Sequence, residues 1–247
     1  MNFRFVLQSF FMALPFFYSN EIKTGGLHFV LNEETSKHVV QVLRMQHGEQ
    51  LQLTDGTGNL FTAEITDDNR KNCAVKILKT ASSQRPATKV TIAISLVKNS
   101  NRFEWFLEKA TEIGVTEIVP LLCSRTEKQH FRHDRMKNIL ISAMLQSQQT
   151  WLPVLQEPVK YADYIKNIQQ GEGLQKYIAH CEEGEKKQLH QRISTTVNQL
   201  ICIGPEGDFT NYEVAEALQN NFVAVALGNT RLRTETAGVV AAVLLCI

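Results

Sequence analysis

The pattern of apolar and polar residues changes once along the chain, at about residue 85. Before that point the two kinds alternate in short runs, as in LQLTDGTGNLFTAEI (51–65), which has a glycine-rich centre. Alternation with a period of two is typical of β-strands with one buried face, and the glycines predict a hairpin turn between two such strands. The run CAVKIL (73–78) repeats the alternation, and one helix is expected at about residues 33–44.

These elements predict a small β-rich unit at residues 20–80, which we expect to form a compact barrel. Residues 1–19 are expected to hold an N-terminal extension and the first strand. The stretch ASSQRPATK (81–89) breaks the alternation with small and polar residues and a proline, so it is predicted to be a linker.

After residue 89 the pattern predicts an α/β domain. VTIAISLV (90–97) is a continuous apolar run, as in a parallel strand that is covered on both faces. A helical stripe of apolar residues ends at Gly114, and Asn101 with Glu104 predicts a capping box at its start. Strands separated by helices predict that residues 90–247 form one domain with a largely parallel sheet. The remaining elements are strands at EIVPLLC, QLICIG and FVAVAL, a helix opened by a capping box at Thr210 and Glu213, and an almost wholly apolar, buried helix at 235–247.

The composition narrows the class of protein. The chain has 247 residues, 43% of them hydrophobic, and a net charge of +1, so any nucleic-acid binding must come from a local patch. Five scattered cysteines without a C-x-x-C pair indicate reduced thiols in a cytoplasmic protein and argue against a zinc site. No apolar run reaches the ~20 residues of a membrane helix. We therefore expect neither a bound metal nor a membrane partner.

The first seventeen residues, MNFRFVLQSFFMALPFF, are apolar enough to be considered as a signal peptide for export. They carry a single arginine and no small-x-small cleavage site, which argues against export. We expect instead that translation starts at Met12 and that residues 1–11 are a dispensable upstream extension. Expression of the two lengths side by side tests this, and a shorter protein that fails to fold would contradict it.

The loop IGPEGDFT (203–210) is the first candidate for a binding site. It follows a predicted strand and precedes a helix, which is where open α/β sheets bind ligands. A tight turn that needs glycine for its backbone is the alternative. A phosphate-gripping G-x-x-G clamp is disfavoured, because Glu206 and Asp208 would repel phosphate. The nucleotide-binding patterns G-x-G-x-x-G and G-x-x-x-x-G-K-[ST] are absent, as is the hydrolase pattern G-x-S-x-G.

The loop LGNTRLRTETAG (227–238) is the second candidate. It places Arg231 and Arg233 directly before the last predicted helix, where the macrodipole makes cations mildly unfavourable. Arginines that only solvate a surface are the alternative. One acidic and one basic loop, both with glycine and both at strand ends, predict the two walls of one ligand site.

A third segment, SRTEKQHFRHDRMK (124–137), carries five Lys and Arg residues against two acids. His130, Phe131 and His133 lie between the charges, and the segment suits contact with a phosphate backbone. A solvated loop and helix face is the alternative. The two histidines are not expected to bind a metal, because no third ligand is evident.

Three separated motifs, IGPEGDF, LGNTRLRTETA and EKATEIGVTEIVPLLCSRT, resemble the ribosomal small-subunit methyltransferase E family. This family belongs to the SPOUT class of S-adenosylmethionine-dependent RNA methyltransferases. The resemblance runs from about Phe17 to the C-terminus, and HVVQVLRMQHGEQLQLTDGTG (38–58) fits the family's PUA-like RNA-binding domain. It implies a trefoil knot in the C-terminal domain and a homodimer. It also implies methylation of N3 of a uridine in 16S ribosomal RNA, either naked or within the 30S subunit.

The resemblance also implies roles for single residues. The cofactor would lie between the GPEG loop, the LGNTRLRTETA loop and a loop near residues 179–182, against Ala179, His180, Gly204, Pro205, Glu206, Gly207, Leu227, Gly228, Asn229, Leu232, Arg233, Thr234, Thr236 and Ala237. The RNA would contact His38, Arg44, Lys98, Arg125, Arg132, Arg135, Gln146 and Ser147.

The methyl transfer that the resemblance implies would explain why arginines precede the last helix. Uridine N3 must lose its proton before it attacks a methyl group, and negative charge then spreads onto O2 and O4. Arg233, with Arg231 in reserve, is expected to stabilise that charge. Glu206 and Glu235 are the nearest candidates for taking the proton.

The chain departs from the family pattern at two places. Family members often carry Glu-Gln-Ser-Gly-Arg where this chain has Leu145-Gln146-Ser147-Gln148-Gln149, and Asp208 replaces the second glycine of the usual GPEGG. Two rival functions stay open at this point. One is a non-catalytic RNA-binding dimer, and the other is a related knotted methyltransferase that acts on tRNA.

Overall fold

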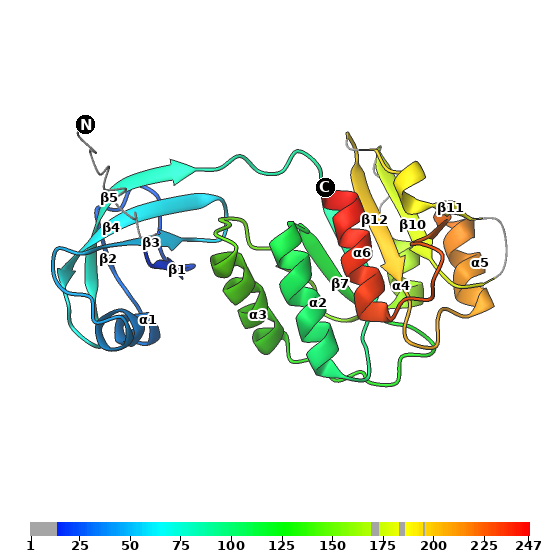
Figure 1. The fold of residues 1–247 in the computed structure, drawn as a ribbon, viewed down its shortest axis with the longest axis horizontal. Coiled ribbons are helices and arrows are strands. Elements are labelled where there is room, and N and C mark those ends of the chain that lie inside the picture. Colours follow the sequence, from blue (N-terminus) through cyan, green and yellow to red (C-terminus); the bar gives the residue numbers. More distant parts are fainter. Residues whose placement is uncertain (1–13, 169–172, 183–185, 195) are drawn as a thin grey trace, which may run out of the picture. The chain divides into compact units, whose positions relative to one another are not determined.

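The structure, a computed structural model, describes residues 14–168, 173–182, 186–194 and 196–247. The chain forms two compact units, the first ending at Ser83 and the second beginning at Gln84 (Figure 1). The upstream extension expected at residues 1–11, and the start expected at Met12, lie outside the described residues.

The first unit is built on a five-stranded sheet with the strand order β1-β3-β4-β5-β2. The predicted hairpin is β3–β4, in which Leu51 pairs with Ala63 and Leu53 with Phe61 in an antiparallel ladder. These side chains are fully buried, as the alternation predicts. The strands are β1 Phe16–Tyr18, β2 His28–Val30, β3 Gln50–Thr54, β4 Asn59–Asp67 and β5 Ala74–Ser82.

Two boundaries in this unit differ from the sequence-based expectation. The expected helix is a short α-helix, α1 (Glu33–Lys37), capped by Asn32 and continued as a π-helical turn, η1 (His38–Val42). Strand β5 extends to Ser82, which pairs with Asn59 of β4, so the first two residues of the expected linker belong to the sheet. Small polar residues can extend an exposed strand end because the ladder uses backbone groups alone.

The second unit is built on an eight-stranded sheet, and every strand pair described in it is parallel. The strand order is β11-β13-β10-β12-β6-β7-β8, and β9 also pairs with β7. The strands are β6 Val90–Ser95, β7 Glu117–Leu122, β8 Val154–Leu155, β9 Val159–Lys160, β10 Leu174–Ala179, β11 Lys187–Gln188, β12 Asn198–Ile203 and β13 Val223–Ala226. The helices are α2 Ser100–Ile113, α3 His133–Gln146, α4 Tyr161–Asn167, α5 Asn211–Gln219 and α6 Thr234–Cys246, with a 3₁₀ turn, η2, at Leu189–Gln191.

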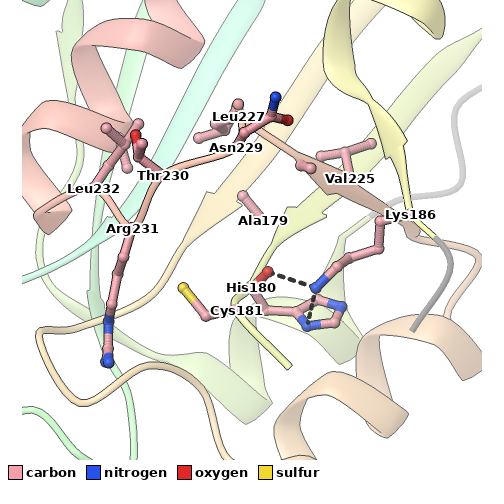
Figure 2. A pocket seen from close by; sticks show the side chains of 13 residues that line it. Ala179, His180, Cys181, Lys186, Val225, Leu227, Asn229, Thr230, Arg231 and Leu232 are labelled. Atoms are coloured by element: carbon pink, nitrogen blue, oxygen red, sulfur yellow. Dashed lines mark hydrogen bonds between the residues drawn. The ribbon is translucent and has the colours of Figure 1, made fainter. Parts of the chain in front are cut away.

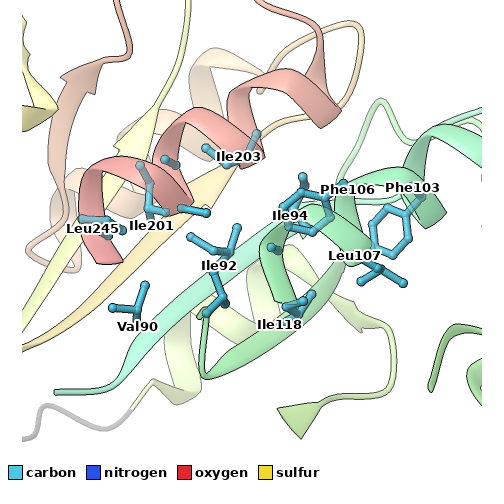
Figure 3. Packing of buried hydrophobic residues seen from close by; sticks show 14 of the residues in the cluster. Val90, Ile92, Ile94, Phe103, Phe106, Leu107, Ile118, Ile201, Ile203 and Leu245 are labelled. Carbon is cyan, nitrogen blue, oxygen red and sulfur yellow. The ribbon is translucent and has the colours of Figure 1, made fainter. Parts of the chain in front are cut away.

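The sheet of the second unit has a hydrophobic core on each face. On strand β6, Ile92 and Ile94 pack into one core with residues of α2 and α6, while Ala93 between them packs into the other with residues of α4 and α5. Figure 3 shows the first core, in which the β6 isoleucines lie between α6 and the Phe106 face of α2. A strand covered on both faces needs apolar residues at every position, which explains the continuous run VTIAISLV.

Two of the three helix ends predicted from local sequence signals are confirmed. Gly114 ends α2 with φ 101°, and Thr210 with Glu213 forms the predicted capping box of α5. The capping box expected at Asn101 and Glu104 is wrong, because α2 begins at Ser100 and the side chain of Asn99 caps it. Asn99 precedes the first helical residue directly, so its side chain reaches the free backbone N–H groups that Asn101, inside the helix, cannot serve.

Helix α6 was expected to be buried, and in the single chain this holds for only one of its sides. One side packs on the sheet and on α2, but Val243 on the other side is 40% exposed, and Val239 and Leu244 are only half-buried. The sequence could not show this, because an apolar residue on the outer side of a helix looks the same as one on its inner side.

Gly238 sets how closely α6 approaches α2. A Cβ at this position would lie 2.6 Å from Cε2 of Phe106 and 2.8 Å from Cδ1 of Ile94. We expect Gly238→Ala to lower the free energy of unfolding by about 1–3 kcal/mol, although alanine favours a helix over glycine. Urea denaturation measures this. Gly26→Ala, whose Cβ would make only ordinary contacts, should be close to neutral, and equal stability of the two variants would contradict the packing argument.

Candidate functional site

Three loops leave the sheet of the second unit side by side. Ala179 at the end of β10 pairs with Ile203 at the end of β12 and with Val225 near the end of β13. Because the strands are parallel, the segments that follow them begin at one edge of the sheet. The loop that follows β10, the GPEG loop (204–210) and the arginine loop (227–233) therefore meet there.

The first hollow at this edge, the loop cavity, encloses about 440 Å³. Figure 2 shows its side chains, with Leu227, Val225 and Ala179 on the sheet side and Arg231 reaching past Cys181. The wall combines apolar side chains from the sheet with polar and charged side chains from the loops, so it can hold both an apolar ring and polar groups of a small molecule. The lining residues are Ala179, His180, Cys181, Lys186, Val225, Ala226, Leu227, Gly228, Asn229, Thr230, Arg231, Leu232 and Ala237.

A second hollow, the arginine hollow, adjoins the loop cavity and encloses about 280 Å³. It carries charge of both signs, with Arg231 and Arg233 on one wall and Glu206 and Asp208 on another. Five residues line both hollows: Ala179, Cys181, Arg231, Leu232 and Ala237. The arginine hollow is completed by Ile203, Gly204, Pro205 and Thr234. The acidic loop and the basic loop thus form walls of one composite site.

The GPEG loop is fixed by several tertiary hydrogen bonds. The Thr234 hydroxyl donates to the Gly204 carbonyl at 3.0 Å, and the Lys98 N–H donates to Oε1 of Glu206 at 3.0 Å. The Arg125 guanidinium donates to the carbonyls of Gly207 at 2.7 Å and Phe209 at 3.3 Å. The loop therefore keeps its shape through tertiary contacts as well as through its glycines.

The arginine loop depends on the backbone of Gly228. This residue has φ 121°, which L side chains rarely adopt, and a Cβ there would meet no atom within 4 Å. Its N–H donates to Oε1 of Gln188 at 2.9 Å, which anchors the loop. Gly228 thus opens directly onto the loop cavity that it lines.

The four predicted catalytic residues occupy different positions. Arg233 is exposed, is the N-cap residue of α6 and lines the arginine hollow, whereas Arg231 lines both hollows. Glu206 lines the same hollow as the two arginines. Glu235 lines neither hollow, and its Oε1 lies 3.7 Å from Nε of Arg102 on α2.

Lys186 is a lining residue that the sequence did not reveal. Its ammonium group donates to the His180 carbonyl at 2.9 Å, as Figure 2 shows. It also donates to the Glu182 carbonyl. Burial lowers the pKa of His180, and the Lys186 charge lowers it further, so the imidazole is neutral at pH 7. The sequence holds no signal for this contact, because Lys186 reaches the loop cavity only through the pairing of β11 with β13.

The predicted cofactor contacts fall into two groups. Gly207 and Thr236 line neither hollow, and the side chain of Arg125 packs over Gly207. The others line at least one hollow: Ala179, His180, Gly204, Pro205, Glu206, Leu227, Gly228, Asn229, Leu232, Arg233, Thr234 and Ala237.

Several predicted RNA contacts are already engaged within the chain. Lys98 forms an ion pair with Glu127 at 2.8 Å, and Arg135 forms two hydrogen bonds to Glu104 at 2.7 and 3.0 Å. These bonds hold the pKa of the Glu104 carboxyl below its ordinary value. Arg125, as described above, serves the GPEG loop. Neutralised or committed cations contribute less to phosphate binding than free ones.

The remaining RNA candidates are more accessible. In the first unit His38 and Arg44 are exposed, and the His38 ring packs edge-on against Phe17 at 5.6 Å. In the second unit Arg132 is exposed at the start of α3, and Gln146 is exposed at its end. The hydroxyl of Ser147 bonds back to the Ala143 carbonyl. Roles in RNA binding stay predictions for all of them.

The described residues offer neither a metal cluster nor a membrane span. Within them, no group of three or more His, Cys, Asp or Glu side chains is placed to hold a metal ion. No helix of the described chain is both long enough and apolar enough to cross a membrane.

Comparison with known proteins places the chain in a family. A family described as "RNA methyltransferase domain" matches residues 83–246, and "RNA methyltransferase PUA domain" matches residues 31–78. The chain is 30% identical to the ribosomal RNA small subunit methyltransferase E of Synechocystis, over 83% of this chain and 68% of the relative. The chain belongs to the ribosomal RNA small subunit methyltransferase E family. Its Rickettsia conorii relative of that name is 29% identical over 83% of each chain.

Solved structures agree with membership of the methyltransferase E family. The crystal structure of a probable rRNA-methyltransferase from Porphyromonas gingivalis is similar with a TM-score of 0.86 and 38% identity, over 93% of this chain and 95% of that one. A methyltransferase E from Neisseria gonorrhoeae, bound to S-adenosyl methionine, has a TM-score of 0.82 and 27% identity over the same shares. Both matches span the two units and confirm the predicted combination of a small β-rich domain with an α/β domain that has a largely parallel sheet.

Proposed function

We propose that the protein transfers a methyl group from S-adenosylmethionine to N3 of a uridine in 16S ribosomal RNA. One observation carries the proposal. Three loops at one sheet edge enclose a cavity with both apolar and polar walls, and an adjoining hollow presents Arg231 and Arg233. The first suits a cofactor with an adenine ring, and the second suits a base that becomes anionic as it reacts.

The loop cavity fits the cofactor in size and character. Its volume of about 440 Å³ lies within the ~300–1,000 Å³ of small-molecule sites. Leu227 and Leu232 offer apolar surface to a ring, while backbone groups near Gly228 can donate and accept hydrogen bonds. When bound, the cofactor would supply an activated methyl group on a positively charged sulfur.

The arginine hollow supplies the chemistry that this chain's own residues perform. Deprotonated uracil carries negative charge on O2 and O4, and a guanidinium held by the start of α6 can pair with either oxygen. Glu206 is the better-placed proton acceptor, because its side chain lines that hollow while Glu235 turns toward Arg102. Holding the two reactants at adjoining sites supplies much of the remaining rate.

Mass spectrometry of ribosomal RNA tests the proposal. Cells that lack the protein should lose one N3-methyluridine from 16S RNA, and expression of the intact chain should restore it. If the same methyl group is lost from tRNA instead, the tRNA methyltransferase alternative is correct. If no modification changes, the non-catalytic RNA-binding alternative is correct. Methylation of purified 16S RNA and of 30S subunits in parallel identifies which one is the substrate.

We further propose that the protein is a cytoplasmic homodimer with a trefoil knot in its second unit. The outer side of α6 supports the dimer, since Val243 is 40% exposed there and Ile247, which directly follows the helix, is exposed as well. An apolar helix side of this kind is stabilised by a partner surface. Sedimentation velocity of the wild-type protein and of Val243→Glu, which should be monomeric, tests the dimer.

RNA binding should depend more on Arg132 than on Arg135. Arg132→Ala removes an exposed cation and should reduce the slope of log K against log salt by about 0.7 for each phosphate that the side chain neutralises. Arg135→Ala should change the slope less, because Glu104 already neutralises that guanidinium. Filter binding at several salt concentrations measures both variants. If neither variant changes the slope, the segment 124–137 is only a solvated face.

A further inference from the structure

The ladder between β10 and β12 ends at the edge of the composite site. Ala179 pairs with Ile203 in the last described register of these strands, and the chains then continue as the loop after β10 and the GPEG loop. Beyond that register, the Asp208 side chain joins the two loops, because its Oδ2 accepts the Cys181 N–H at 2.7 Å. Cys181 and Asp208 both line the arginine hollow, so this bond lies in the wall of the composite site.

The backbone of Asp208 is unusual for a residue with a side chain. Its φ of 64° lies in the left-handed region, which favours glycine and in which aspartate and asparagine are the better tolerated alternatives. Its N–H closes a turn onto the Pro205 carbonyl at 2.9 Å, and Oδ1 accepts the Phe209 N–H at 2.8 Å. Each carboxylate oxygen thus accepts a hydrogen bond from a backbone N–H group, one within the GPEG loop and one in the loop after β10.

We propose that Asp208 is a positioning residue that latches the loop after β10 to the GPEG loop and thereby sets the affinity for the cofactor. The proposal rests on the proposed function, since it names a control on the cofactor site. A glycine would adopt φ 64° more easily but would leave the Cys181 N–H without this acceptor. The carboxylate therefore offsets the strain of its own backbone by joining two walls of the site.

The latch acts by ordering the site before the ligand arrives. Hydrogen bonds from backbone N–H groups to a carboxylate are charge-assisted and stronger than neutral ones. Without the bond to Cys181, the two loops would separate more often, and binding would have to restore their alignment. Affinity falls by the fraction of molecules in which the loops are correctly placed. That loss is the same for any ligand that needs both loops, whatever its charge.

Two substitutions separate the latch from the charge of Asp208. Asp208→Asn keeps an oxygen for the Cys181 N–H and tolerates the left-handed backbone, so the dissociation constant of S-adenosylmethionine should rise by less than about threefold. Asp208→Gly relieves the backbone but removes both bonds, and the dissociation constant should rise by about tenfold. S-adenosylhomocysteine, which lacks the sulfonium charge, should lose affinity by the same factor. Isothermal titration calorimetry with both ligands measures all four values.

A control and a direct readout complete the experiment. Asn221 also has a positive φ, 63°, in the second unit but lines neither hollow, so Asn221→Gly should leave both affinities unchanged. Hydrogen exchange of the ligand-free protein should show a protected Cys181 amide in the wild type and in Asp208→Asn, and a rapidly exchanging one in Asp208→Gly.

The outcomes distinguish the latch from the proposed function. If wild-type protein binds neither ligand, the proposed function fails. If Asp208→Gly binds as tightly as wild type, or more tightly, the latch is refuted while the cofactor site stands. If Asp208→Asn falls as far as Asp208→Gly, and only for the charged ligand, Asp208 acts through its charge and the latch is again refuted.

Discussion

Arg233→Ala should slow methyl transfer by about 10²–10³-fold while changing the affinity for S-adenosylmethionine little. The reason is charge. The reactive group of the cofactor is cationic, so an arginine gains nothing beside it, whereas the uracil becomes anionic as its N3 proton leaves. Arg233 lines the arginine hollow but not the loop cavity, which fits an interaction made with the base. Contacts that form mainly in the transition state appear in the rate rather than in ground-state binding.

Single-turnover kinetics on Arg233→Ala, together with its cofactor dissociation constant, make the measurement. Arg231→Ala is the matched comparison, because Arg231 lines both hollows and should therefore weaken cofactor binding as well. Arg233→Lys keeps the charge but loses the planar, forked donor group and should recover only part of the rate. A near-normal rate with poor cofactor binding in Arg233→Ala would assign this arginine to the cofactor site and leave its catalytic role without support.

Gly228→Val should abolish measurable cofactor binding without unfolding the protein. Valine at φ 121° is strained, and the loop can relieve that strain only by moving the wall of the loop cavity. The added side chain would also project into the open space beside the backbone. If the strain and the added side chain together weaken binding by about 3 kcal/mol, the dissociation constant of S-adenosylmethionine rises by about 100-fold. Calorimetry measures the affinity, and circular dichroism confirms that the variant is folded.

Gly114→Val is the matched control for this loss. Gly114 also has a positive φ, 101°, and open space around its missing Cβ, but it ends α2 and lines neither hollow. Both variants therefore strain the backbone at a positive φ, but only Gly228→Val does so in the wall of the loop cavity. Unchanged cofactor affinity in a folded Gly228→Val would remove this loop from the cofactor site. An equal loss in Gly114→Val would show that strain alone, and not the site, is responsible.

The position of the composite site followed from the sequence because it depends on local order along the chain. Each of the two motif loops comes directly after a run that reads as a strand, and parallel strands deliver their following loops to one edge. The Gly114 helix end and the Thr210 capping box were equally predictable, since each uses partners only three or four residues away. The helix start at Asn99 was missed because two asparagines, 99 and 101, offer the same local signal.

The partners of charged side chains could not be read from the chain. Arg125 was assigned to RNA, but its guanidinium donates to the Gly207 carbonyl, 82 positions away in sequence. Arg135 likewise pairs with Glu104 on the neighbouring helix, and Glu235 turns toward Arg102. A long side chain can reach many partners, and which one it finds depends on how distant elements pack.

The sequence by itself determined the division into a β-rich and an α/β part, the central strands with the helices α2, α5 and α6, and the two loops that line the composite site. These features depend on local patterns: alternating or continuous apolar runs, helix caps and glycines. Each pattern acts over a few residues, so it can be recognised in the sequence before the fold is known. Only the tertiary structure decided that Lys186 lines the loop cavity, that Asp208 joins two loops, and that one side of α6 is left uncovered. The first depends on the pairing of β11 with β13 and the second on the pairing of β10 with β12, and both pairings bring together segments that the sequence keeps far apart.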